Sequence, residues 1–239
     1  MDILYWINLN PNIEFKTTGK MFFNKYLCRA VIFCPGGRAI YEQGPIYSNI
    51  DRRRNLYRSF NYAGSWAPRS SKSLERADIK MLETLRNIVS TPMSVRLRVE
   101  EPLIQIYGET EQDIKDFIER LDFDHQSHIK ELTVPKNQEH ADLLRDNKIL
   151  KKTRRNNYRY RVVFKEGRLD LATKSNILKY LDSLDDIVFV PAGTRNQLSN
   201  GFTGFWGAYF YTNDPSILTF LELIHSGAIA NINEIVTVE

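Results

Sequence analysis

Two segments of the chain, 107–134 and 210–238, carry the same pattern of apolar residues, and this repeat constrains the fold more than any other feature. In each segment apolar residues recur at i, i+3, i+4 and i+7: Ile114, Phe117, Ile118 and Leu121, then Ile217, Phe220, Leu221 and Ile224. This spacing places the four side chains on one face of a helix. The sequence therefore predicts two amphipathic helices of about three turns, one in each half of the chain.

Each predicted helix has a start signal and is followed by a short strand. Thr110 and Asp113 form the pattern of a capping box, and Asp214 precedes Pro215 as an N-cap precedes a proline in the first turn. The strands read ELTV and EIVTV. Agreement in the helix, its start and the following strand indicates an internal duplication.

The first parts of the two halves also agree. Each half begins with a strand that starts at a tyrosine, contains Arg-x-Val and ends at Gly-Arg, and each continues with a helix and two further strands. The predicted elements are 26–38, 73–90 and 94–107 in the first half, and 158–168, 171–184, 187–191 and 204–211 in the second. The order β-α-β-β-α-β in each half is that of the ferredoxin-like, or split βαβ, fold.

We therefore expect an α+β protein with two tandem ferredoxin-like halves, each a four-stranded antiparallel sheet with two helices on one face. The first half is predicted to span 1–135 with a long basic insertion at 39–72, and the second to span 158–239, with 136–157 as a basic linker. A shorter insertion, AGTRNQLSNGFTG, separates the central strands of the second half. Long loops of this kind are usually functional or mobile.

The open face of the first sheet is predicted to be polar. Strand alternation places Arg96, Arg98 and Tyr107 opposite the apolar set, and Arg29 joins them from the first strand. A solvated face with cross-strand ion pairs explains this pattern as well as a surface for a single-stranded polynucleotide does. Both alternatives stay open at the level of the sequence.

The second sheet is predicted to expose tyrosines. In GFWGAYFY, Trp206 and Phe210 are expected in the core because tyrosine tolerates an open face better, which leaves Tyr209 and Tyr211 outward. This strand resembles the aromatic strand motif of RNA-recognition modules, and the resemblance implies base stacking by these two tyrosines. The alternative is that the two halves pack sheet to sheet and bury them.

Arginine-rich clusters are the strongest functional signal in the sequence. They lie in the long insertion, in the linker and in the strand that follows it: Arg52, Arg53, Arg54 and Arg58, then Lys152, Arg154, Arg155, Arg159 and Arg161. Such runs are usually solvated faces, but these are interleaved with tyrosine and asparagine, as in a groove that contacts phosphates. The planar guanidinium also suits phosphates and stacked bases better than an ammonium does.

Catalytic patterns are weak. The first strand ends without a carboxylate, which argues against a polymerase-type palm with two metal ions. His125 and His128 are explained more simply by a polar loop than by a metal site. The tandem organisation and the segment GTRNQLSNGFTGF are similar to CRISPR RNA endonucleases with a glycine-rich loop. That resemblance implies RNA affinity more than cleavage, because the general-base histidine of that family has no counterpart before residue 125.

Composition is compatible with a folded binding protein. The chain has 239 residues, a formal net charge of +4 and 42% hydrophobic residues, and Cys28 and Cys34 show no disulfide framework. We expect neither a signal peptide nor a membrane-spanning helix, and hence a cytoplasmic location.

We predict a protein that binds single-stranded or structured RNA or DNA without catalysis, metal or small-molecule cofactor, and without a membrane partner. The main alternative is a protein–protein adaptor or virion-type assembly component that docks through 39–72. A weaker alternative is a metal-independent endoribonuclease.

Overall fold

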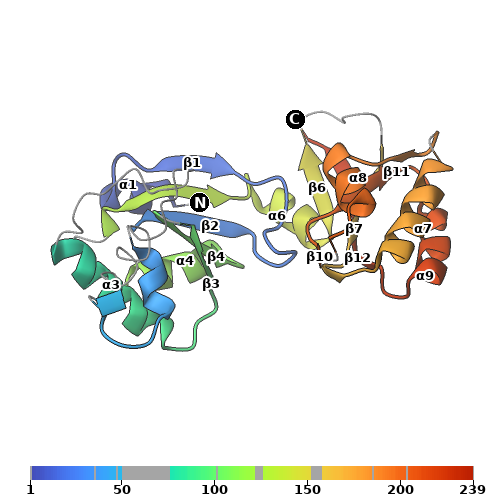
Figure 1. Ribbon diagram of the computed structural model, residues 1–239. Helices are drawn as coiled ribbons and strands as arrows, with labels where there is room; N and C mark the ends of the chain where they lie inside the picture. Colours follow the sequence, from blue (N-terminus) through green and yellow to red (C-terminus); the bar gives the residue numbers. More distant parts are fainter. Residues whose placement is uncertain are drawn as a thin grey trace. The chain divides into compact units, whose positions relative to one another are not determined.

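The computed structural model describes residues 2–34, 36–46, 48–49, 76–100, 102–121, 126–151, 158–184, 186–202 and 204–238. Within these residues the protein is a mixed α+β structure with two five-stranded sheets and a two-stranded ribbon. The chain divides into two compact units, Met1–Ala141 and Asp142–Glu239, which are described one at a time (Figure 1).

The first unit is built around a sheet in the order β1-β5-β2-β4-β3. In chain order its elements are α1 (Ile3–Leu9), β1 (Glu14–Thr17), β2 (Cys28–Phe33), η1 (Gly37–Tyr41), α3 (Arg76–Val89), β3 (Arg96–Glu100), β4 (Leu103–Gly108), α4 (Glu111–Ile118) and β5 (Ile129–Val134). β1 runs parallel to β5, and the other neighbouring pairs are antiparallel. The capping box predicted at Thr110 and Asp113 is present, and α4 packs against β2 and β4. Figure 1 shows α3 and α4 on the same side of the sheet.

The second sheet has the order β6-β12-β7-β11-β9, and β10 and β8 form the separate ribbon. The helix α6 (Gln138–Arg145) spans the boundary between the units. The elements that follow it are β6 (Lys148–Lys151), β7 (Tyr160–Phe164), β8 (Gly167–Arg168), α7 (Leu171–Asp182), β9 (Val188–Phe189), α8 (Ala192–Ser199), β10 (Gly204–Phe205), β11 (Tyr209–Thr212), η3 (Pro215–Ile217), α9 (Leu218–Ile224) and β12 (Ile229–Thr237). α7 packs against both α8 and α9.

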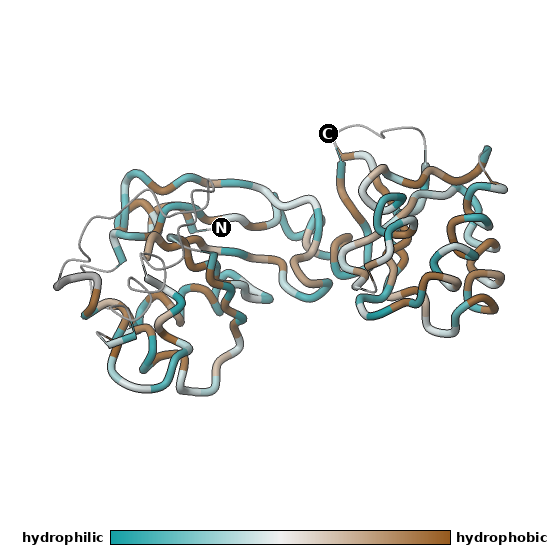
Figure 2. The backbone as a smooth tube through the Cα atoms, viewed as in Figure 1, coloured by the Kyte–Doolittle hydropathy of each residue, from teal (hydrophilic) through white to brown (hydrophobic). Residues whose placement is uncertain are grey.

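A hydrophobic core lies between this sheet and its helices. Val162, Phe164 and Phe210 of the sheet are fully buried in the same cluster as Ile177 of α7 and Leu221 of α9. Figure 2 shows hydrophobic and hydrophilic residues alternating along these helices and strands. None of the described helices combines the length and the apolar character that a membrane crossing requires.

The two sheets share an internal strand order. With β1 and β6 set aside, the strands of each unit follow the order fourth, first, third, second, as β5-β2-β4-β3 and as β12-β7-β11-β9. β1 and β6 each run parallel beside the fourth strand. The pairing of the first and fourth strands also has an irregularity at the same place, next to Ile129 in one unit and Ile229 in the other.

The expectation of four antiparallel strands in each half is wrong, because each sheet has a fifth, parallel strand. β1 and β6 have 4 residues each, which is too short to establish a period. Their strand conformation depends on backbone pairing with an edge that is distant in sequence. As a consequence, part of the segment 136–157 that was expected to be a linker forms α6 and β6.

The predicted aromatic strand is interrupted, and this changes which rings are buried. β10 and β11 are separated at Trp206 and Gly207, and Gly207 has a φ of 62°. The alternation restarts after this interruption, because a left-handed residue breaks the pleat. Phe205 and Phe210 are therefore 1% and 0% exposed, whereas Trp206 is 63% exposed. The prediction for Phe210 is confirmed and that for Trp206 is wrong.

Two helical details also differ from expectation. The segment AGTRNQLSNGFTG contains α8 and the start of β10, so it does not form the glycine-rich loop that resembled CRISPR RNA endonucleases. Phe220 was expected on an apolar stripe but is 49% exposed. Its helix opens with the 3-10 turn η3, whose tighter winding rotates the buried stripe toward Ile217, Leu218 and Leu221.

Candidate nucleic-acid interface

The structure describes about half of the residues that the sequence proposes for nucleic-acid binding. The described ones lie on the two sheets: Arg96, Arg98 and Tyr107 in the first unit, and Arg159, Arg161, Tyr209 and Tyr211 in the second. The others lie outside the described residues: Arg52, Arg53, Arg54, Arg58, Lys152, Arg154 and Arg155. Most of the insertion 39–72 also lies outside them.

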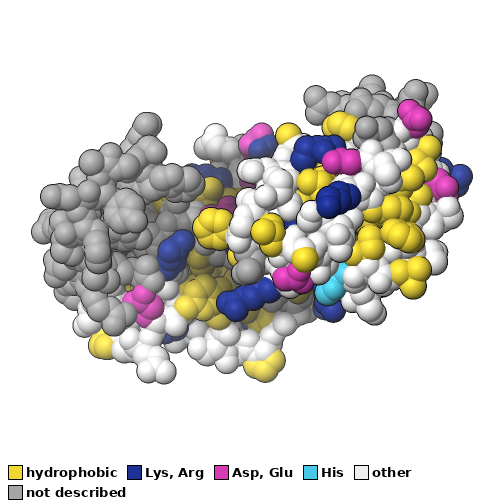
Figure 3. Space-filling model, turned by 45° about the vertical axis from the view of Figure 1, so that its right-hand side comes forward, with side chains coloured by type: hydrophobic (Ala, Val, Ile, Leu, Met, Phe, Trp, Pro, Cys, Tyr) yellow, Lys and Arg dark blue, Asp and Glu magenta, His cyan; other side chains and the backbone are white. Residues whose placement is uncertain are grey.

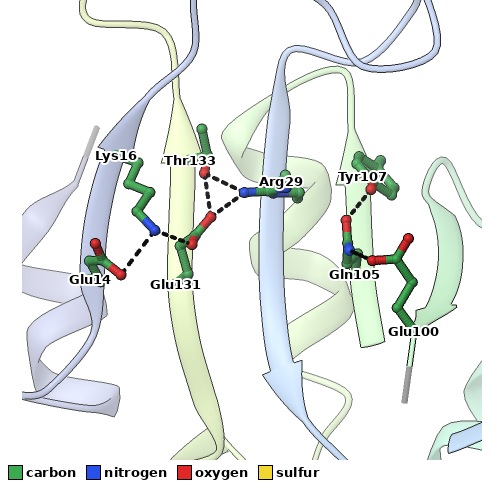
Figure 4. A network of polar contacts seen from close by, with 8 residues as sticks. All are labelled: Glu14, Lys16, Arg29, Glu100, Gln105, Tyr107, Glu131 and Thr133. Carbon is green, nitrogen blue, oxygen red and sulfur yellow. Dashed lines mark hydrogen bonds and ion pairs between the residues drawn. The ribbon is translucent and has the colours of Figure 1, made fainter. Parts of the chain in front are cut away.

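A network of ion pairs covers one side of the open face of the first sheet (Figure 4). Arg29 of β2 forms an ion pair with Glu131 of β5 and a weak hydrogen bond of 3.5 Å with Thr133. Lys16 of β1 donates to Glu131 at 2.6 Å and lies 3.0 Å from Glu14. Both cations therefore already have carboxylate partners.

The rest of this face is also engaged. Tyr107 donates to the amide oxygen of Gln105, and the Gln105 amide donates to Glu100 at 2.6 Å (Figure 4). Glu100 also pairs with Arg98 at 2.5 Å. The guanidinium of Arg96 lies 3.9 Å from the centroid of the Phe23 ring. These contacts fit a solvated face with cross-strand ion pairs, which was one of the two alternatives for this sheet.

Tyr107 does not offer its ring for stacking. Tyr107 lies on the open face of the sheet, as expected, but it is only 3% exposed, because the connection between β1 and β2 folds over it. Phe22 and Phe23 of that connection approach the Tyr107 ring to centroid distances of 5.3 and 4.9 Å. Burial also raises the pKa of Tyr107. The expectation of an accessible ring at this position is therefore corrected.

The carboxylate of Glu131 stays ionised in this network. Its partial burial alone would raise its pKa, but hydrogen bonds from Lys16, Thr133 and Arg29 outweigh that effect and lower the pKa below its ordinary value. The negative charge of Glu131 thus neutralises the central arginine of the first sheet.

The second sheet presents a different surface on its open face. Four rings, which we call the aromatic cluster, gather there: Tyr158, Phe189, Tyr209 and Tyr211. The rings of Tyr158, Phe189 and Tyr211 have centroids 6.2 to 6.3 Å apart and planes within 21° to 25° of one another. Tyr209 meets Tyr211 edge to face at 5.5 Å. Phe189 is 40% exposed.

Positive charge lies directly on this cluster. The guanidinium of Arg161 lies 3.9 Å from the centroid of the Tyr209 ring, and Lys151 Nζ lies 5.2 Å from that of Tyr211. Within the part of the chain that the structure describes, Arg161 forms no ion pair, and its Nε is buried without a hydrogen-bond partner. An arginine held over a ring without a carboxylate partner is suited to a phosphate or to a second stacked ring.

Sheet register explains why the two faces differ. Arg29 lies opposite Tyr107 in β4, and Arg161 lies opposite Tyr211 in β11, so the two arginines occupy equivalent positions. On the fourth strand Glu131 lies opposite Val31, and the equivalent residue opposite Val163 is Asn231. The second unit therefore has an amide where the first has the carboxylate that neutralises its arginine.

Arg159 does not join the aromatic cluster. It pairs with Glu234 at 3.0 Å, and its guanidinium lies 5.2 Å from the ring centroid of Tyr160. Ile149 and Ile235, paired on β6 and β12, are buried, so the accessible part of the face lies over β7, β11 and β9.

The insertion between β9 and β11 supports the aromatic cluster from the side. The hydroxyl of Thr194 on α8 accepts from the backbone N–H of Tyr209 at 3.0 Å and donates to its carbonyl at 2.8 Å. α8 thereby supplies the hydrogen bonds that β9 is too short to provide. Sequence reasoning missed Phe189 and Tyr158 as members of the cluster. The alternation in IVFVP could have indicated Phe189. Tyr158 could have been found because it lies three residues before Arg161, as Tyr26 lies three residues before Arg29.

Comparison of the chain with protein-family models, with curated proteins and with solved structures found no match.

Proposed function

We propose that the protein binds single-stranded nucleic acid on the open face of its second sheet. The observation that carries this proposal is Arg161, held on the ring of Tyr209 beside further aromatic rings and without a carboxylate partner among the described residues. Bases stack on tyrosine and phenylalanine irrespective of sequence, and arginine contacts the phosphates between them. A single strand is favoured because the bases of a duplex already stack on one another.

We also infer that each unit is a ferredoxin-like fold with one added parallel strand at the edge, and that the two units descend from one duplicated unit. The common strand order and the common irregularity beside the fourth strand support this inference. In this fold the open face of the sheet is the usual place for stacking rings in RNA-recognition modules. After a duplication only one of the two faces needs to keep that role.

Binding is tested by fluorescence anisotropy with labelled RNA and DNA oligonucleotides of mixed sequence, single-stranded and duplex, at about 50 mM salt and above. We expect Tyr211→Ala to weaken single-strand binding by about 1–3 kcal/mol, or about 5- to 150-fold. Arg161→Ala should lower the slope of log K against log salt by about 0.7.

The matched control is Arg195→Ala. Arg195 lies on α8, its side chain is 45% exposed, and it pairs with Asp182 at 2.7 Å. Its loss changes the net charge as Arg161→Ala does but leaves the aromatic cluster intact. Absence of binding to every oligonucleotide at low salt, or equal effects of the two substitutions, would refute the proposed interface.

A protein partner is the second candidate, and exposed apolar side chains favour it. Leu223 and Phe220 of α9 are 78% and 49% exposed, and Leu171 of α7 is 57% exposed. Figure 3 shows hydrophobic side chains in patches on the visible face of this unit. Exposed apolar patches of this kind mark interaction surfaces in many proteins. The two candidates are separated by purifying the protein and comparing the absorbance ratio A260/A280 before and after a high-salt wash. Nucleic acid that the salt removes supports the first candidate, and a protein complex that resists the salt supports the second.

A further inference from the structure

Trp206 is an exposed aromatic residue that lies outside the aromatic cluster. It is 63% exposed and lies in the interruption between β10 and β11. Exposure by itself does not indicate a binding site. The surroundings of Trp206, however, hold both its backbone and its indole ring in one arrangement.

The backbone of Trp206 is held by one side chain. The amide of Gln197 on α8 accepts from the N–H of Trp206 at 3.0 Å and donates to its carbonyl oxygen at 3.0 Å. The indole lies directly against Gly204, where an added Cβ would come within 1.9 Å of a ring atom. Glycine at this position therefore leaves the space that the indole occupies.

A buried lysine fixes the segment that leads to Trp206. Lys174 of α7 is 1% exposed, and its Nζ donates to the carbonyl oxygens of Gln197, at 2.8 Å, and of Phe202. Burying an ammonium is costly unless its hydrogen bonds are made. The lysine thus ties α8 and Phe202, which precedes the ribbon, to α7.

A cation shares the face of the ribbon on which the indole lies. In the antiparallel pair of β10 and β8, Gly204 lies opposite Arg168. Residues directly opposite in such a pair project to the same face. The Cβ direction of Gly204 points at the indole, so Arg168, which is exposed, projects from the ribbon on the same side as Trp206.

We propose that Trp206 and Arg168 form an additional nucleotide position, in which one base stacks on the indole and an adjacent phosphate contacts the guanidinium. This inference rests on the proposed function and extends it. Two residues lie between Trp206 and Tyr209, so three peptide units limit their Cα atoms to about 11 Å apart. This distance is short enough for one strand that lies on the aromatic cluster to reach the indole one or two nucleotides further along.

Gly204→Ala provides a sharp test because it displaces the indole without removing it. We expect Gly204→Ala and Trp206→Ala each to weaken binding of a single-stranded oligonucleotide by about 3- to 30-fold. The double variant should be no weaker than Trp206→Ala alone, because the added methyl group then meets no ring. The matched control is Gly167→Ala on the other strand of the ribbon, where an added Cβ meets nothing within 4 Å.

Tryptophan fluorescence gives an independent readout. Stacking of a base on Trp206 should quench emission when the oligonucleotide is added, and Trp206→Phe should remove that quenching while retaining an aromatic ring. Arg168→Ala should weaken binding about 3- to 10-fold and reduce its salt dependence. Thermal unfolding of each variant establishes that it is folded. If Gly204→Ala unfolds, Trp206→Phe and Arg168→Ala still decide the question.

The outcomes distinguish the two proposals. Wild-type affinity and unchanged quenching in the Trp206 variants, together with weakened binding in Tyr211→Ala, would overturn the additional position and leave the proposed function standing. Absence of binding by the wild-type protein would overturn both. Equal weakening by Gly167→Ala and Gly204→Ala would show a general disturbance of the ribbon, and it would also overturn the role of the indole.

Discussion

Asn231→Glu should convert the open face of the second sheet into the ion-paired state of the first. Asn231 lies opposite Val163, as Glu131 lies opposite Val31. A glutamate at this position is a diagonal neighbour of Arg161, about 7–8 Å away between Cα atoms. The same diagonal is bridged in the first unit by the ion pair of Arg29 with Glu131. We therefore expect the new carboxylate to engage the guanidinium of Arg161.

The magnitude follows from the charge that a bound phosphate would meet. Two unit charges about 7 Å apart interact with about 0.6 kcal/mol at a dielectric constant of 80 and about 2.4 kcal/mol at 20. Because Arg161 and Tyr209 are partly exposed, the cost lies between these limits, at about 1–2 kcal/mol. Binding of a single strand should weaken about 5- to 30-fold, and its salt slope should fall by about 0.7.

The assay is the anisotropy titration at several salt concentrations, with two controls. Asn231→Gln has the size of glutamate without its charge and should bind as the wild type does. Asn176→Glu places the same charge on α7, where the residue is exposed, and should change affinity much less. Unchanged affinity and slope in Asn231→Glu would refute the assignment of Arg161 to phosphate binding. An equal loss of affinity in Asn176→Glu would show that the effect of Asn231→Glu comes from net charge alone and not from the position of the carboxylate.

Three further predictions concern the fold. Hydrogen bonds lower the pKa of Glu131 despite its burial. The ionised carboxylate therefore contributes fully to the free energy of unfolding above the ordinary glutamate pKa of about 4.3, and this contribution is lost as the pH falls through the lowered pKa. Urea unfolding between about pH 5 and 2 should show this loss in the wild type and a smaller one in Glu131→Gln. Lys174→Met should lower the free energy of unfolding by about 2–4 kcal/mol, since the carbonyl oxygens of Gln197 and Phe202 lose their donor, and unchanged denaturant midpoints would contradict this. Cys28 and Cys34 lie at the start and just past the end of β2, about 20 Å apart, so they should stay reduced and react with a thiol reagent only on unfolding; a mobility shift under non-reducing conditions would show otherwise.

Local sequence signals determined much of the architecture. The capping box at Thr110 and the N-cap at Asp214 are both present, because their hydrogen bonds join residues within one helical turn. Alternation correctly placed Phe210 in the core and Tyr209 and Tyr211 on the opposite face, since these residues lie within one uninterrupted strand. The repeated order of helices and strands was also readable, because each element carries its own periodicity.

The same local reasoning failed where a distant segment or a single backbone angle decided the outcome. β1 and β6 are strands because each pairs with the edge of a strand that is far away in sequence. Trp206 is exposed because the left-handed Gly207 restarts the alternation after it. Tyr107 is covered by rings from another connection, which no pattern within β4 indicates.

Arg29 and Arg161, the two central arginines, show most clearly which properties the sequence determines and which the tertiary structure determines. In the sequence Arg29 and Arg161 occupy nearly the same pattern, a tyrosine three residues before and a valine two residues after. The sequence alone therefore established that both lie on strands and carry positive charge. Only the tertiary structure decided that Glu131 neutralises the first, whereas Asn231, at the equivalent position, leaves the second without a carboxylate partner among the residues that the structure describes. Electrostatic interaction depends on distance in space, and sheet pairing brings to each arginine a fourth strand that lies far along the chain.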